Sequence, residues 1–149
     1  MKNIMQNTSQ EMNSDKRRIT MTRYEKAVEK HQKGYNCAQA VLCAFSDKIG
    51  MEEDDLFRLS EAFGGGMGGT QNVCGAVSGM VFVAGAITSA GIDKLPETNK
   101  KDSYAFAAKL MKSFEDKVGS LICADIKCKG LRSCDGCIED AVKILEENL

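Results

Sequence analysis

Cysteine is the residue type with the most distinctive chemistry in this chain, which contains seven of them. Cys123, Cys128, Cys134 and Cys137 lie close together, and the last two form the sequence Cys-Asp-Gly-Cys. A Cys-x-x-Cys spacing is used by dithiol redox sites and supplies half of many zinc sites. The spacing of the first two, Cys-x4-Cys, is not the close-set pair that a zinc ribbon needs. The density of thiols therefore predicts redox or metal chemistry without specifying zinc.

Cys74 follows a glycine-rich stretch, GGGMGGTQNVCGAVSG, over residues 64–79. Glycine loses much backbone entropy on folding, so we expect this run to bring backbone close to Cys74. The apolar residues that follow predict a helix that begins at Cys74. Free N–H groups and the helix dipole at such a position lower the pKa of a thiol. The alternative is a small buried thiol, with the glycines serving only helix packing.

Cys37 and Cys43 lie in one predicted helix but in different surroundings. Asn36 is a suitable N-cap, which places Cys37 in the first turn of that helix. Cys43 lies between Leu42 and Ala44, and we expect it to be a thiol of the core. His31, the only histidine, lies near lysines at a polar helix end, where a solvated side chain is expected.

The elements that must position these thiols are helical throughout. Apolar residues recur at helical spacing, and no segment shows the alternation of a strand. We predict a single-domain, all-α bundle of five or six helices over residues 21–149, after a disordered polar leader at 1–20. The expected helices cover 22–33, 36–50, 52–63, 74–90, 97–119 and 134–149, with a linker at 120–132. Ser133 is the expected N-cap of the last helix, whose apolar face contains Ile138, Val142 and Leu145. The apolar face expected for 97–119 contains Tyr104, Phe106, Leu110, Met111 and Phe114.

The composition of the chain indicates which partners and which cellular compartment to expect. A net charge of −1 and a pI of about 5.9 give no basic surface for nucleic acid. An odd number of cysteines and the lack of a signal-peptide pattern at the N-terminus favour a reducing cytoplasm. Residues 73–92 are uncharged and long enough for a membrane span, but their Gly, Ala, Ser and Thr content favours a buried central helix instead. The same helix is a candidate contact in a homodimer.

Two segments carry a resemblance to a known family. The sequence GYNCAQAVLCAF contains Cys37 and the sequence CGAVSG begins at Cys74, with further cysteines downstream. Over residues 24–145 the chain resembles the C_GCAxxG_C_C family, whose members are predicted to be redox-active through four cysteines. The resemblance implies Cys37, Cys74, Cys123 and Cys137 as those four, with Cys128 and Cys134 as alternatives downstream. It also implies Gly75, Ala76 and Gly79 as the small residues of the central motif at the cofactor or thiol site.

Three functions are compatible with these residues. The first is thiol–disulfide exchange or electron transfer with a thiol or electron-transfer partner, in which Cys74 is the attacking thiolate and Cys37 resolves the mixed disulfide. The second is an iron–sulfur cluster or zinc held by the same four thiols. The third is a non-catalytic helical interaction protein whose cysteines are mostly packing.

Overall fold

The computed structural model describes residues 10–13, 16 and 20–149, and within them it is all-helical. The fold class is therefore confirmed, while the predicted leader lies mostly outside the described residues and stays a prediction. The described residues contain no strand and one isolated antiparallel bridge, between Val73 and Ile122. The helices are α2 (Arg23–Gln32), α3 (Cys37–Cys43), α4 (Ser46–Ile49), α5 (Glu53–Ser60), α6 (Gly75–Thr88), α7 (Lys100–Val118), α8 (Cys123–Cys128) and α9 (Cys134–Asn148), with 3-10 helices η1 (Glu61–Phe63) and η2 (Ile92–Lys94).

The predicted number of five or six helices was too low, because two short helices were not expected. The segment 36–50 is divided near Phe45, so that α3 and α4 follow one another. The expected linker at 120–132 contains α8, which is only six residues long. The helix expected to start after Pro96 begins instead at Lys100.

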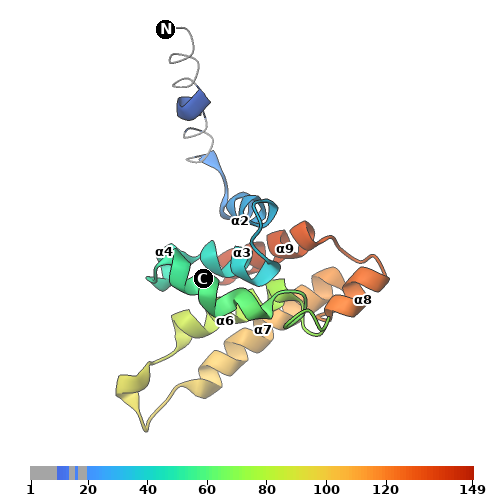
Figure 1. The fold of residues 1–149 in the computed structure, drawn as a ribbon. Coiled ribbons are helices and arrows are strands. Elements are labelled where there is room, and N and C mark those ends of the chain that lie inside the picture. The colour runs from blue at the N-terminus through green and yellow to red at the C-terminus, as the bar shows by residue number, and fades with distance from the viewer. Residues whose placement is uncertain (1–9, 14–15, 17–19) are drawn as a thin grey trace.

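Helix α6 lies in the middle of the bundle, in contact with α3, α7 and α9 (Figure 1). Its residues from Gly75 to Met80 are buried, as are Val83 and Ala84. This confirms the interpretation of the segment as a buried central helix. None of the described helices combines the length and the hydropathy needed to span a bilayer.

Helices α3 and α6 approach each other closely. A Cβ atom added at Gly79 would lie 2.8 Å from the carbonyl oxygen of Ala38, and one at Gly75 would lie 3.1 Å from the Cβ of Cys37. Only residues without a side chain permit this distance between the two backbones. The small residues of the central motif thus bring the start of α3, and Cys37 with it, against the start of α6.

The outer helices pack on this centre through apolar faces. On α9, Ile138, Val142 and Leu145 are fully buried, which confirms the predicted apolar face. On α7, Phe114 is buried, but Tyr104 is 68% exposed and does not belong to the apolar face predicted for it. Tyr104 lies in the N-terminal part of α7, which projects beyond the rest of the bundle (Figure 1).

Candidate dithiol site

Five of the seven cysteines line a single cavity of about 210 Å³. They come from α3, the start of α6, α8 and α9, and are Cys37, Cys74, Cys123, Cys134 and Cys137. All four cysteines implied by the family resemblance are among them, and the fifth is Cys134. The cavity therefore gathers thiols from segments that are far apart in the sequence.

The other two cysteines lie elsewhere. Cys43 is buried at the end of α3, where its thiol contacts the carbonyl oxygen of Glu53 at 3.7 Å and burial raises its pKa to about 11. This confirms Cys43 as a core thiol. Cys128 is exposed at the C-terminal end of α8 and does not line the cavity.

Cys74 immediately precedes α6, as the sequence predicts, and is 6% exposed. Hydrogen bonding by the Cys137 thiol has the largest effect on its pKa, followed by the backbone N–H groups of Ala76 and Val77 and the charge of Lys127. Together these groups lower the pKa of Cys74 to about 7 despite burial. Cys74 is therefore about half thiolate at pH 7 and largely thiolate above it.

Cys74 and Cys137 line the cavity together and are almost fully buried, and they are called here the inner pair. Cys137 lies in the first turn of α9 and is 2% exposed. The neighbouring Cys74 and burial raise the pKa of Cys137 well above its ordinary range. Within the inner pair, Cys74 is thus the thiol that ionises first.

Cys37 and Cys134 also line the cavity and are called here the outer pair, because both residues are only partly buried. Asn36 caps α3 through a capping box with Gln39, with both hydrogen bonds at 2.9 Å, and so fixes Cys37 as the first helical residue. Burial, followed by the neighbouring Cys134 and Cys74, raises the pKa of Cys37. The thiol with the largest effect on Cys74 is thus Cys137, and the thiol with the largest effect on Cys37 is Cys134.

A side-chain cap also fixes the start of α9. Ser133 caps the helix as predicted, and its hydroxyl accepts a hydrogen bond of 3.0 Å from the N–H of Gly136. Cys134 is the first residue of this helix and Cys137 follows one turn later. Residues three apart on a helix lie on the same side, so both thiols face the cavity.

The glycine loop packs against Cys123. Gly66 has a φ of +73°, and a Cβ atom there would lie 2.8 Å from the Cβ of Cys123. The loop is also tied to α8 by a hydrogen bond of 2.7 Å from the N–H of Cys123 to the carbonyl oxygen of Asn72. The sequence suggested that the glycines approach Cys74, but this close contact is made with Cys123. Burial raises the pKa of Cys123.

His31 is not a fully solvated side chain, so the expectation for it was wrong. It lies at the end of α2, is partly buried, and lines the thiol cavity. Its Nδ1 is 2.6 Å from Oδ1 of Asp135, the residue between Cys134 and Gly136 in the Cys-Asp-Gly-Cys sequence. Only the packing of α2 on α9 brings them together, and neither residue's neighbours in the sequence indicate the pair.

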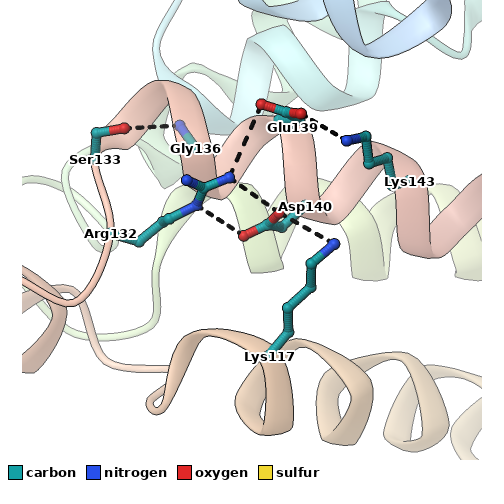
Figure 2. A network of polar contacts seen from close by, with 7 residues as sticks. All are labelled: Lys117, Arg132, Ser133, Gly136, Glu139, Asp140 and Lys143. Carbon is teal, nitrogen blue, oxygen red and sulfur yellow. Dashed lines mark hydrogen bonds and ion pairs between the residues drawn. The ribbon is translucent and has the colours of Figure 1, made fainter.

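A buried carboxylate anchors the segment that leads into α9. Asp140 is 3% exposed, and its oxygens accept hydrogen bonds from Arg132 at 3.0 and 3.3 Å. Lys117 of α7 lies 3.2 Å from the same carboxylate (Figure 2). Arg132 also lines the thiol cavity. The sequence analysis missed this network because Asp140 has the spacing of an ordinary residue on a charged helix face.

The fold and the cavity define a small, all-α protein with clustered thiols. The chain belongs to the family described as "Putative redox-active protein (C_GCAxxG_C_C)", whose model matches residues 35–148. The resemblance noted from the sequence is thereby confirmed. No curated protein and no solved structure matches the chain.

The thiols of the cavity are also the residues predicted to bind a metal. Thiolates are the ligands that zinc and iron–sulfur clusters prefer. Within the part of the chain that the structure describes, no three side chains of His, Cys, Asp or Glu are arranged to hold a metal ion. Ligation by Cys37, Cys74, Cys123 and Cys137, with Cys128 or Cys134 as alternatives, stays a prediction.

The low pKa of Cys74 leads to a testable pH dependence. Alkylation requires the thiolate, so its rate at Cys74 is expected to rise through pH 7 and to level off about one pH unit above. Peptide mass spectrometry after brief treatment with iodoacetamide measures this rate, and the exposed Cys128 serves as a reference in the same sample. A Cys74 rate that still rises steeply above pH 8.5 would contradict the assignment.

Proposed function

We propose that this protein is a thiol–disulfide redox protein in which Cys74 and Cys137 cycle between a dithiol and a disulfide. The observation that carries the proposal is the environment of Cys74. Cys74 lies at the start of a long buried helix, where two N–H groups and the thiol of Cys137 lower its pKa, and it lines one cavity together with Cys137. This environment supports Cys74 as the nucleophile and Cys137 as the thiol that resolves the mixed disulfide.

The exchange proceeds in two steps that balance. The Cys74 thiolate attacks one sulfur of a substrate disulfide, the substrate S–S bond breaks, and one half of the substrate leaves as a thiolate that takes up a proton. Cys137 then loses its proton and attacks the Cys74 sulfur, which releases the second half. Two electrons pass to the substrate, and the Cys74–Cys137 disulfide remains.

The size of the cavity suggests which substrates can react. A volume of about 210 Å³ is below that of pockets that hold drug-sized ligands. Because Cys74 and Cys137 are almost fully buried, a low-mass disulfide or a disulfide on an extended peptide is a better substrate than one on a folded surface. Two cationic side chains, Lys127 and Arg132, line the same cavity. Their positive charge favours substrates that carry a carboxylate.

A second candidate function is a metal or iron–sulfur site, and it is favoured by one observation, the presence of five thiols around one cavity. A bound cluster would supply one-electron transfer, and a bound zinc would supply structural stability. A non-catalytic interaction protein, a homodimer, a cytoplasmic location and the absence of a nucleic-acid partner stay predictions.

The deciding experiment combines metal analysis with disulfide mapping. Protein purified without oxygen is analysed for iron, zinc and acid-labile sulfide and by visible spectroscopy, then treated with oxidised glutathione and mapped by mass spectrometry. We expect less than stoichiometric metal and a Cys74–Cys137 disulfide. Stoichiometric iron and sulfide would replace the dithiol function by the cluster function. The variant C128S, which alters a thiol outside the cavity, is the control and is expected to behave as the parent.

A further inference from the structure

We propose that Cys37 and Cys134 form a second redox pair that returns electrons to the inner pair, and that His31, held by Asp135, accepts the proton of the attacking thiol. The delivery of electrons to Cys74 and Cys137 rests on the proposed function. The oxidation of the outer pair itself does not, because Cys37 and Cys134 can form a disulfide whether or not the inner pair is active.

The first argument is the arrangement of the thiols in the cavity. Cys37 of α3 and Cys134 of α9 line the same cavity, and Cys134 has the largest effect of the neighbouring thiols that raise the pKa of Cys37. Both are more exposed than Cys74 and Cys137. A reductant that is too large to reach the inner disulfide can therefore still meet the outer pair.

The second argument is the link between the two pairs. Cys134 and Cys137 lie three residues apart in the first turn of α9, on the side that faces the cavity. Cys134 belongs to the outer pair and Cys137 to the inner pair. Electrons can therefore pass from one pair to the other along a single helical turn.

The transfer consists of two exchanges that conserve atoms and electrons. The Cys134 thiolate attacks the Cys137 sulfur of the oxidised inner pair, the Cys74–Cys137 bond breaks, and Cys74 leaves as a thiolate. The Cys37 thiolate then attacks the Cys134 sulfur, the Cys134–Cys137 bond breaks, and Cys137 leaves and takes up a proton. The inner pair is reduced, and the outer pair holds the disulfide until an external thiol reduces it.

The direction of transfer follows from the environment of Cys74. The groups that stabilise the Cys74 thiolate also stabilise the reduced form of the inner pair. The inner disulfide is therefore a stronger oxidant than the outer disulfide. The same stabilisation makes Cys74 a good leaving group in the first exchange. Electrons therefore flow from the outer pair to the inner pair.

The third argument is the imidazole beside the outer pair. Asp135 engages Nδ1 of His31, so Nε2 is the ring nitrogen that can accept a proton. His31 lines the cavity together with both thiols of the outer pair. The charged and titratable groups that face the cavity from the other elements are Cys74, Cys123, Lys127, Arg132 and Cys137. The two cations among them favour the thiolate once the proton has moved to His31.

The outer pair is tested in a variant that lacks the inner pair. The double variant Cys74→Ser and Cys137→Ser, kept as the full chain, is treated with diamide, and its disulfides are mapped by mass spectrometry. A Cys37–Cys134 disulfide is the expected product. Two free thiols at these positions, or pairing of either with Cys123, would overturn the proposal, provided that circular dichroism shows the parent fold. If that fold is lost, the same mapping is made on the parent oxidised with two equivalents.

The role of His31 is tested by the pH dependence of Cys37–Cys134 disulfide formation in the Cys74→Ser and Cys137→Ser double variant. Adding His31→Gln to that variant is expected to slow formation of the disulfide about 100-fold at pH 7. This is the lower end of what a positioned base contributes. The rate should approach that of the parent at pH 9, where hydroxide replaces the base. A slowing that is equal at every pH, or no slowing, would overturn the role. Asp116→Asn, which removes an exposed ion-pair carboxylate on α7, is the control and is expected to leave this rate unchanged.

Disulfide mapping of the oxidised parent distinguishes a failure of the proposed function from a failure of the second redox pair. If the parent forms only the Cys37–Cys134 disulfide after any time of oxidation by glutathione, and Cys74 and Cys137 never pair, the proposed function fails and the outer pair stands. If Cys74 and Cys137 pair while Cys37 and Cys134 stay reduced at two equivalents of oxidant, the proposed function stands and the second pair fails.

Discussion

Replacing Cys74 by Ser is expected to lower the rate at which the reduced protein cleaves oxidised glutathione by at least about 1,000-fold, because a neutral hydroxyl is a far weaker nucleophile than a thiolate. The substitution is nearly isosteric at a site that is 6% exposed, so the fold should be kept. Release of glutathione in a single turnover, followed by mass spectrometry, measures the effect.

Replacing Cys137 by Ser has a different expected outcome and serves as the companion test. This variant retains the attacking sulfur but lacks the resolving one, so it should accumulate a mixed disulfide between Cys74 and glutathione. Its Cys74 also loses the strongest hydrogen-bond donor to its sulfur, which raises the pH needed for attack. Unchanged turnover in the Cys74→Ser variant would remove the basis of the proposed function.

The second large effect is expected at Gly79, where α3 and α6 approach most closely. In a Gly79→Ala variant the new Cβ would lie 2.8 Å from the carbonyl oxygen of Ala38 and 2.9 Å from the Cβ of Val41. Both neighbours belong to a buried helix, so they cannot move without shifting α3. We expect a loss of about 1–3 kcal/mol in the free energy of unfolding, the usual cost of overpacking a core. Urea denaturation followed by circular dichroism measures it.

Gly85 provides a matched control in the same helix. A Cβ atom there meets nothing within 4 Å, so Gly85→Ala gains helix propensity without steric cost. The free energy of unfolding should rise by up to about 1 kcal/mol. The two substitutions are chemically identical, and their effects are expected to have opposite signs. If both variants were stabilised, the close approach of α3 and α6 would be refuted.

The parts of this structure that sequence predicts well are those decided by neighbouring residues. Asn36 and Ser133 cap their helices as expected, because a cap depends on side chains three residues away. Cys74 lies at the start of its helix because a glycine loop precedes a run of apolar residues. The buried face of α9 follows from its helical periodicity.

The parts that sequence could not predict depend on packing between distant segments. The shared cavity of Cys37 and Cys134 and the contact between His31 and Asp135 both require α9 to lie against the N-terminal helices. Helix α8 was missed because six residues are too few to show a periodic pattern.

The thiols of the cavity come from both halves of the chain, and this constrains the order in which the protein can fold and be oxidised. In the unfolded chain, closing a short loop costs less entropy than closing a long one, so Cys134 and Cys137 meet each other far more often than Cys134 meets Cys37. An oxidant that acts before the helices have packed therefore captures a local disulfide within the Cys-Asp-Gly-Cys sequence. That bond would remove one thiol from each pair before either had formed. Correct assembly thus requires that the chain collapse while its cysteines are still reduced, and the redox chemistry of the finished site depends on the order of folding and oxidation.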